Sequence, residues 1–546
     1  MYFNWEEFPL ITPEQIAATG KTRSPVVVIG AGPVGLAIAL GLSQHNVPCI
    51  VLERRTTISK GSRALAMTRR SLQILDHLGV GKAVMDIAMP WGEGWTYYGK
   101  EMVHYMNIAP PPNEKHGQTN LQQCWMEQLL LEQIAKTPLV EVRFGHEVVA
   151  LTPEDTQVVL DVNTAAGNYT LSADYLVAAD GPRGTTRRQL GLDYEGTSYT
   201  QQFVINDIIC QLPIPAGRRL YFNPPYLPGK AVLMHGAPFN MWRLDFQLLD
   251  GQDADEEMQP EKVHARIKAH FELMGLDNID YELILTSIYR TNALSLPTYN
   301  KQRVLFAGDA AHQVPIFGGR GVNHGYADAH NLAWKLARVV KGQSAPQLLD
   351  TYTQERRGAI LDTLAELTKT TLFITTPSPG ISLMRDAVLS LSITEKFLNN
   401  LFDPYASPPY EYTDSPLNAA PAKDPAFTSR ADVGAIPPDG IATKNGDRLY
   451  DLLGPCFTVL VFSDTANDPA ILALERSVHA SDTDARFQVL PAQCQIADLF
   501  DAKPDTVYLL RPDQRVAGRW RHITPEALAA ALDHAALSTA QFQEAP

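Results

Sequence analysis

A glycine-rich turn near the start of the chain constrains the fold more than any other feature. Residues 26–29 form a short apolar run with three valines, typical of a strand buried on both faces. An apolar stretch of helical composition follows the turn, and a second apolar run then ends at Glu53. Strand, turn, helix and strand in this order predict a parallel sheet with helices packed on it. The turn itself consists of Gly30, Ala31, Gly32, Pro33, Val34 and Gly35.

The spacing of these glycines predicts a nucleotide site. In such turns the first glycine permits the tight bend, the second lets a diphosphate approach the backbone, and the third lets helix and strand pack closely. Glu53 lies 53 − 30 = 23 residues after Gly30, where an acidic side chain accepts hydrogen bonds from a ribose, and Arg54 follows it. A turn with a purely structural role is the alternative. The pattern alone does not separate FAD from NAD.

The rest of the chain divides by composition. Between 191 and 289, alternating apolar and polar runs separated by Pro, Gly and Asn predict an antiparallel sheet, and a segment rich in Pro, Ala and Asp at 405–445 predicts a linker. The irregular text at 90–116 predicts a loop or an insertion. We therefore expect an extension at 1–24, a nucleotide-binding domain from 25–89, 117–190 and 290–360, a second domain from 90–116 and 191–289, a helical region and linker at 361–424, and a C-terminal domain at 425–546.

Composition excludes several classes of protein. The formal charge is 46 − 60 = −14 without a basic run, which disfavours nucleic acid or an anionic membrane as a partner. The five cysteines are at least 38 positions apart, so the sequence contains no CxxC pair or disulfide framework. The first ten residues lack the features of a signal peptide, and no apolar stretch is long enough to span a membrane. We expect a cytoplasmic protein.

Two later patterns identify the family that the chain resembles. The first runs from Ala178 through Asp180-Gly181 to Arg187. The second, Ala307-Gly308-Asp309-Ala-Ala-His, continues through Pro315 and a glycine-rich turn to Lys335. Together with the first glycine turn, these patterns resemble the FAD-dependent aromatic hydroxylases, which are single-component flavoprotein monooxygenases.

The resemblance implies a fold, cofactors and binding residues. It implies an α/β chain with a Rossmann-like FAD-binding domain, an inserted antiparallel-sheet substrate domain and a C-terminal thioredoxin-like domain. FAD is the implied cofactor, with NADPH or NADH as co-substrate and with dioxygen and a small aromatic substrate as partners. It assigns Asp309 to a ribityl hydroxyl, the backbone of Gly321, Val322 and Asn323 to the flavin pyrimidine, Asp180 and Arg187 to FAD and the NAD(P)H path, and Arg63, Gln123 and Pro315 to the surroundings of the flavin.

The C-terminal part extends the resemblance. Residues 445–462 and 507–517 look like the thioredoxin-like tail module of the phenol hydroxylase and 3-(3-hydroxyphenyl)propionate hydroxylase branch. Because Cys456 and Cys494 lie 38 residues apart, we expect a packing or dimer-stabilising role and no thiol redox chemistry. The sequence leaves a homodimer open.

The implied activity is hydroxylation of a phenolic or related aromatic through a flavin C4a-hydroperoxide. His235, Tyr221 and Arg243 lie on predicted strands of the second domain and are candidates for activating the phenol, although each could be structural. Arg320 stands where the family often has an uncharged residue. It could stabilise reduced flavin or attract an anionic substrate, or it could pair with a carboxylate or face solvent.

Other functions remain as alternatives. A Baeyer-Villiger or epoxidising enzyme on the same scaffold is one, and a flavin-binding protein without turnover is another. The sequence has no GxSxG turn and no P-loop, which disfavours a serine hydrolase or P-loop enzyme. Three histidines at 312, 324 and 330 lack metal-ligand spacing, so we expect no metal site.

Overall fold

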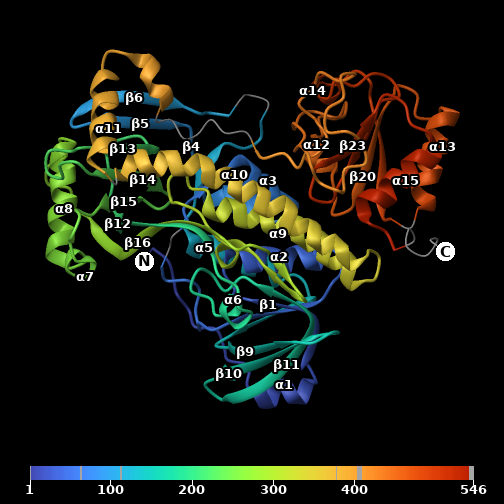
Figure 1. Cartoon of the computed structure of the whole chain (residues 1–546), viewed down its shortest axis with the longest axis horizontal. Coiled ribbons are helices and arrows are strands. Elements are labelled where there is room, and N and C mark those ends of the chain that lie inside the picture. The colour runs from blue at the N-terminus through green and yellow to red at the C-terminus, as the bar shows by residue number, and fades with distance from the viewer. Residues whose placement is uncertain are drawn as a thin grey trace.

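The computed structural model describes residues 2–61, 64–110, 114–376, 378–401, 409–481 and 483–539. Figure 1 shows three parts: a sheet with helices at the bottom, a second sheet at the upper left, and a C-terminal module at the right. Helices α9 (Gly321–Val340) and α10 (Asp350–Thr375) run between these parts. No helix in the described ranges is long and apolar enough to cross a bilayer.

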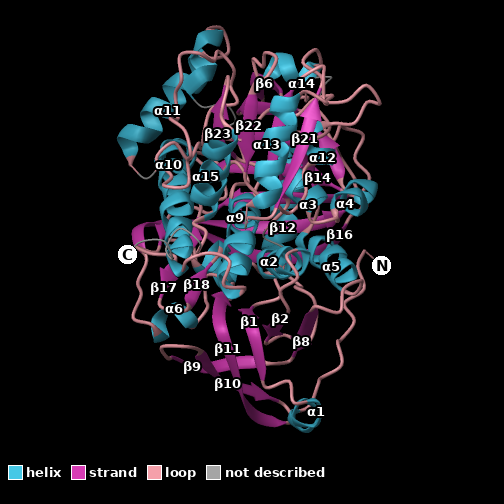
Figure 2. Cartoon of the chain, turned by 90° about the vertical axis from the view of Figure 1, so that its right-hand side faces the viewer, coloured by secondary structure: helices cyan, strands magenta, loops and turns pink. Residues whose placement is uncertain are grey.

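The glycine turn belongs to a sheet whose central strands are parallel. Val26, Val27 and Val28 are fully buried, as their β-branched run predicts, because helices cover the strand. Figure 2 shows α2, α5 and α9 above these strands. The path of the sheet is β17 (Asn300–Lys301), β18 (Val304–Phe306), β11 (Gly167–Ala178), β1 (Arg23–Ile29), β2 (Cys49–Glu53) and β8 (Val140–Phe144), and β10 (Val158–Thr164) and β9 (Glu147–Pro153) extend it from β11.

Several helices and a small sheet complete this part. The small sheet contains β3 (Ala66–Met67), β7 (Gln118–Asn120) and β4 (Met89–Trp91). The helices are α1 (Pro13–Thr19), α2 (Pro33–Gln44), α3 (Arg69–His77), α4 (Gly81–Ile87), α5 (Gln123–Ile134) and α6 (Thr186–Gln189), with the 3-10 turns η1 (Gly308–Ala310) and η2 (Pro346–Leu349).

The second sheet is antiparallel except where β13 and β5 pair in parallel. Its order is β19 (His312–Gln313), β16 (Glu282–Ser295), β12 (Glu195–Ile209), β15 (Met241–Gln247), β14 (Ala231–Ala237), β13 (Arg218–Phe222), β5 (Glu93–Tyr98) and β6 (Glu101–Asn107). The irregular text at 90–116 therefore includes two strands of this sheet, β5 and β6. Helices α7 (Ala254–Glu257), α8 (Pro260–Leu273), α11 (Pro379–Leu391) and η3 (Lys396–Leu401) lie around it.

The two faces of the second sheet differ. On the outer face, Trp242, Leu244 and Phe246 pack against apolar residues of α8. On the inner face, Phe203, Leu220 and neighbouring apolar residues pack against Phe317, which follows Pro315, and against α10 and α11. The inner face is therefore the one that meets the loop predicted to contact flavin.

The C-terminal module has a four-stranded sheet with helices around it. Trp334 of α9 packs edge-on against Phe457, with ring centroids 5.6 Å apart, so the module docks on α9. Its strands run in the order β21 (Ala485–Leu490), β20 (Phe457–Phe462), β22 (Val507–Leu510) and β23 (Val516–Trp520). Its helices are α12 (Leu449–Leu452), α13 (Pro469–Ala480), α14 (Gln495–Leu499) and α15 (Pro525–Ala536).

Candidate functional site

The glycine turn at residues 30–35 has room for a ligand at one position. Gly30 has φ +103°, and a Cβ there would lie 2.4 Å from the carbonyl oxygen of Ala179. A Cβ on Gly35 would lie 2.0 Å from the carbonyl oxygen of Gly30, whereas one on Gly32 would meet no atom within 4 Å. The fold thus requires Gly30 and Gly35, and Gly32 borders open space at the N-terminus of α2. A diphosphate fits there because helix N–H groups point into that space.

Glu53 at the end of β2 faces the same turn. Its Oε2 accepts a hydrogen bond from the backbone N–H of Ala31 at 2.9 Å, and Arg55 holds both carboxylate oxygens at 2.9 and 3.0 Å. Burial alone would raise the pKa of Glu53, but the bonds and charge of Arg55 lower it overall. The carboxylate is therefore ionised and suits ribose hydroxyls. Sequence reasoning missed Arg55, and Arg54, which it named, is exposed.

Asp309 lies in a turn that a buried carboxylate holds in place. Asp328 of α9 accepts hydrogen bonds from the backbone N–H of Gly308 at 2.9 Å, from His312 at 2.6 Å and from Arg356 at 2.7 Å. Burial would raise the pKa of Asp328, but the charges of His312 and Arg356 hold it below its usual range. Asp328 positions the turn, and sequence reasoning missed it although it lies within the second pattern.

Tyr194 connects the two later sequence patterns. Its hydroxyl donates to the backbone oxygen of Asp309 at 2.8 Å, and the guanidinium of Arg187 lies 4.5 Å from its ring centroid. Asp180 accepts a hydrogen bond from the hydroxyl of Thr186 at 2.8 Å, and burial raises its pKa. The structure thus brings Arg187 and Asp309 together through Tyr194.

The start of α9 presents backbone donors. The Asn323 carboxamide accepts hydrogen bonds from the Thr68 N–H at 2.8 Å and the Ser71 hydroxyl at 2.6 Å, and it donates to the Ala66 oxygen at 3.0 Å. This side chain ties α9 to α3. The backbone N–H groups of residues 321–323, including those of Gly321 and Val322, belong to the first turn of α9 and have no intrahelical partner.

Arg63 and Gln123 are also predicted to lie near the flavin. Arg63 lies outside the described residues. Gln123 begins α5, where its side chain donates to Glu127 at 2.8 Å and accepts from the Ala64 N–H at 3.5 Å.

The inner face of the second sheet carries a polar row. Asp207, Arg243, His235 and Arg218 are cross-strand neighbours on β12, β15, β14 and β13. Arg243 forms a two-bond ion pair with Asp207, with both N–O distances 2.8 Å. Burial lowers the pKa of His235 to about 3, and the charges of Arg218 and Arg243 contribute. His235 is therefore neutral at physiological pH.

Asp245 lies on the same face, two residues along β15 from Arg243. Its cross-strand neighbours are Ile205 and Leu233, so it lies between the polar row and the apolar cluster that contacts Phe317. Burial raises the pKa of Asp245 to about 7. The charge of Arg243 lowers this pKa, and the charge of Asp207 raises it. Its buried Oδ1 makes no hydrogen bond. Such an atom in a folded protein requires an explanation.

The structure does not bring Tyr221 to this group. Its ring stacks on Tyr97 at 4.5 Å and lies edge-on to His270 at 4.7 Å, within the cluster of the outer face that includes α8. Arg320 is also elsewhere: it immediately precedes α9 and lines a cavity with Asp362 and Glu366. Of the four candidates for catalysis, only His235 and Arg243 share the inner face.

No cluster of three or more His, Cys, Asp or Glu side chains suited to a metal ion occurs among the residues that the structure describes. The chemical groups at the candidate site are instead backbone donors, buried carboxylates and a neutral histidine. These groups suit a diphosphate, a polyol and an aromatic hydroxyl.

Comparison with protein families gives one match. The model of the FAD binding domain family matches residues 23–366, which is more than half of the chain. This range includes the three sequence patterns, the sheet that contains β1, the second sheet and the start of α10.

Curated relatives match over a similar stretch. A 3-(3-hydroxy-phenyl)propionate/3-hydroxycinnamic acid hydroxylase of Paraburkholderia xenovorans (strain LB400) is 32% identical over 337 residues, covering 61% of this chain and 52% of the relative. One of the same name from Shigella sonnei (strain Ss046) is 31% identical, with 61% and 59% covered. The chain thus spans between half and three fifths of the curated relatives' length.

Solved structures with the same fold cover almost the whole chain. The flavin-dependent monooxygenase PieE, crystallised with FAD and substrate, has a TM-score of 0.80 at 24% identity and covers 94% of this chain and 99% of its own. Aklavinone-11 hydroxylase, in a ternary complex with FAD and aklavinone, has a TM-score of 0.76 at 23% identity, covering 94% and 98%. The C-terminal module therefore belongs to the shared fold.

Proposed function

This chain belongs to the FAD binding domain family, and from that premise we propose that it is an FAD-dependent, NAD(P)H-consuming monooxygenase that hydroxylates a phenolic or related aromatic substrate. The balanced reaction consumes a phenol, dioxygen, NAD(P)H and a proton, and yields a dihydroxybenzene, NAD(P)⁺ and water. When bound, FAD supplies the redox chemistry, accepting a hydride and activating dioxygen.

The arrangement of the inner face carries this proposal. An apolar surface beside Phe317 suits an aromatic ring, and the carboxylate of Asp245 lies at its border. A pKa near 7 lets this carboxyl accept the proton of a phenol at physiological pH, which raises the electron density of the ring. Asp207 forms an ion pair with Arg243 and so fixes the positive charge of Arg243 near Asp245. Neutral His235 offers a hydrogen bond. We assign proton acceptance to Asp245.

The remaining residues bind and orient the cofactor. Glu53 suits the ribose, and the space beside Gly32 suits the diphosphate. Asp309 suits the ribityl chain. The N–H groups at the start of α9 face the pyrimidine, where they stabilise negative charge. Arg320 adds a positive charge next to these groups, and Asp180 and Arg187 lie on the NAD(P)H path. We further propose that the C-terminal module is of the thioredoxin type.

One experiment tests the function. Purified protein with FAD is mixed with NADPH or NADH and a panel of phenolic acids, and the oxidation rate and the product mass are measured. Oxidation that the substrate stimulates, with one oxygen atom from ¹⁸O₂ added to the ring, supports hydroxylation. Oxygen inserted beside a carbonyl or across a double bond would instead support a Baeyer-Villiger or epoxidising enzyme. Bound FAD without stimulated oxidation would support a flavin-binding protein without turnover.

Replacing Asp309 with alanine is expected to weaken FAD binding by roughly 10- to 100-fold, because a charge-assisted hydrogen bond contributes about 1.5–3 kcal/mol. The dissociation constant can be measured by titrating apoprotein with FAD and following flavin fluorescence. Asp277→Ala, at an exposed aspartate, is the control. Equal FAD affinity in the two variants would remove Asp309 from the site.

Replacing Cys456 and Cys494 together with serine is expected to leave the turnover rate nearly unchanged. Both cysteines are free, and Cys494 accepts a hydrogen bond from the Ala497 N–H as the N-cap of α14, a position that serine fills well. Stopped-flow absorbance of the flavin measures reduction by NADPH. A folded double variant that binds FAD but is not reduced would show that the module has a redox role.

A further inference from the structure

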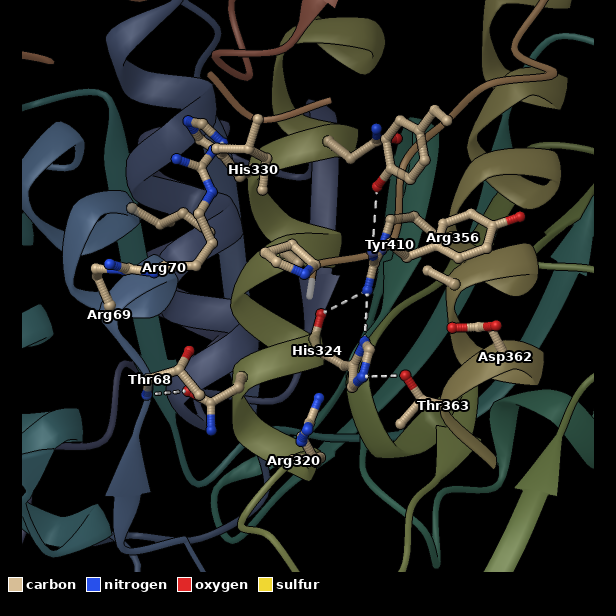
Figure 3. Close-up of a pocket in the computed structure, with 18 of the residues that line it drawn as sticks. Thr68, Arg69, Arg70, Arg320, His324, His330, Arg356, Asp362, Thr363 and Tyr410 are labelled. Atoms are coloured by element: carbon tan, nitrogen blue, oxygen red, sulfur yellow. Dashed lines mark hydrogen bonds between the residues drawn. The ribbon is translucent and has the colours of Figure 1, made fainter. Parts of the chain in front are cut away.

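A cavity of about 280 Å³ begins beside Arg320 and Asn323 at the start of α9 and extends to the C-terminal module, away from the groups assigned to FAD. It follows α9 from Arg320 to Asn331, a rise of roughly 16 Å at 1.5 Å per residue. α3 and α10 form its two sides, and segments near Tyr410 and Arg515 close it toward the C-terminal module. Figure 3 shows Thr68, Arg69 and Arg70 on one side of the cavity, Tyr410, Asp362 and Thr363 on the other, and Arg320 and His324 between them.

Two guanidinium groups at the module end of this cavity have no carboxylate partner among the described residues. Arg70 donates to the backbone oxygen of Asp513 at 2.9 Å and to the side chains of Gln514 at 2.8 Å and Gln73 at 3.4 Å, and it lies 3.3 Å from His330 Nδ1. Arg515 donates to the backbone oxygens of Tyr410 at 3.0 Å and Gly434 at 2.7 Å. All of these acceptors are uncharged, so neither guanidinium forms an ion pair with a described carboxylate.

The nearby carboxylate is already engaged. Asp513 also lines the cavity, but its oxygens accept hydrogen bonds from Arg511 at 2.5 and 2.9 Å and from Asn331 at 3.0 Å. Arg515 is only 7% exposed, and its guanidinium lies 3.5 Å from the Tyr412 ring centroid. Burial lowers the pKa of Arg70, and the positive charge of Arg515 adds to this effect. The two cations therefore repel each other.

The rest of the cavity lining carries charges of both signs. Asp362 and Glu366 of α10 line it together with Arg320 and Arg356. The ring nitrogens of His324 form hydrogen bonds with the Arg356 guanidinium at 3.1 Å and with the Thr363 hydroxyl at 3.0 Å. An anion is favoured beside Arg70 and Arg515, because neither guanidinium has a carboxylate partner among the described residues.

We propose that the Arg70–Arg515 end of this cavity binds a phosphate group of a small ligand. Two neighbouring guanidinium groups match a charge near −2, which a phosphate monoester carries at pH 7 and a single carboxylate does not. The phosphate comes from a pyridine nucleotide, as the proposed function would use, or from free phosphate. The site itself does not depend on the proposed function. Since the two arginines belong to α3 and to the C-terminal module, the ligand bridges these parts.

Isothermal titration calorimetry tests the site without turnover. FAD-loaded protein is titrated with sodium phosphate, NADP⁺ or NAD⁺, and the Arg70→Gln and Arg515→Gln variants are compared with wild type. We expect each substitution to weaken phosphate or NADP⁺ binding by roughly 10- to 100-fold, because each removes a charge-assisted hydrogen bond. Binding of NADP⁺ without binding of free phosphate or NAD⁺ supports a 2′-phosphate as the ligand. Binding of free phosphate supports the free ion.

Controls separate loss of the site from loss of the fold. Arg430→Gln, at an exposed arginine, should bind as wild type does. Arg515→Lys keeps the charge and should bind more tightly than Arg515→Gln. Circular dichroism and the flavin spectrum check that each variant is folded. If wild type binds none of the probes, or if all folded variants bind them equally, the proposal is wrong.

Discussion

Replacing Asp245 with asparagine is expected to lower the rate of substrate hydroxylation by about 100- to 10,000-fold, the usual contribution of a positioned general base. Asparagine has the same shape but cannot accept the phenolic proton. In wild type, kcat/KM should rise with pH and level off above an apparent pKa near 7, since the ionised form of Asp245 is the active one. The variant should lose this rise. Rates are measured as hydroxylated product over pH 5.5–9.

The same substitution should change the pH dependence of stability. The native pKa of Asp245 is raised from 3.8 to about 7, so the native state retains a proton that the unfolded state releases. Wild-type stability therefore falls as pH rises from about 4 to 7, and the variant lacks this loss of a few kcal/mol. Thermal melting at pH 5 and pH 8 measures the difference even if no substrate is known.

A matched control makes the test specific. Asp161 is an exposed aspartate of another strand, β10, and Asp161→Asn should leave both the rate and the melting profile unchanged. A folded Asp245→Asn enzyme with wild-type kcat and an unchanged pH profile would exclude Asp245 as the base. The proposed function would then remain testable through other groups of the inner face.

Replacing Glu355 with glutamine is expected to destabilise the docking of the C-terminal module on α9 and α10 by about 3–5 kcal/mol, as breaking a buried ion pair usually does. Glu355 is fully buried and accepts hydrogen bonds from Arg511 at 2.5 and 2.9 Å, from Lys335 at 2.7 Å, and from Asn331 and Ser415. Glutamine would leave the charge of Lys335 uncompensated. Burial already lowers the pKa of Lys335 to about 8.

Amide hydrogen exchange measures this effect locally. Exchange in β22, β23 and the second half of α9 should accelerate by roughly 100- to several thousand-fold, which corresponds to the expected 3–5 kcal/mol. Glu272→Gln changes an exposed glutamate of α8 and should alter exchange little, because surface ion pairs contribute 0–1 kcal/mol. Equal protection in the two variants would show that the ion cluster does not hold the module.

Local sequence signals predicted the geometry of the first glycine turn and its flanking strands well. The turn at residues 30–35 and the strand ending at Glu53 depend on neighbouring residues only, so their geometry could be predicted from spacing. Asp309 was also named from its pattern, and its role at FAD stays a prediction. Asp328 lies inside that pattern, but its role depends on contacts with Gly308 and Arg356 across the fold, which spacing does not reveal.

The proposed substrate side requires knowledge of strand pairing. Alternation along β15 already places Arg243 and Asp245 on one side of the strand, so Asp245 could have been found once Arg243 was named. The face on which Tyr221 lies could not be found, because it depends on how β13 pairs with β14 and on which side α8 packs. Contacts between Glu355 and Arg511 join residues 156 positions apart and leave no local signal.

The ion cluster between α9, α10 and the module also has a consequence during translation. Arg511 is synthesised 156 residues after Glu355, which takes roughly 8 to 30 s at 5–20 residues per second. During this interval, the nascent chain contains Lys335 and Glu355 but not the module residues that complete their cluster. The ribosome-bound intermediate must therefore leave this surface open to water or to a chaperone. The module can cover α9 only after β22 has been synthesised.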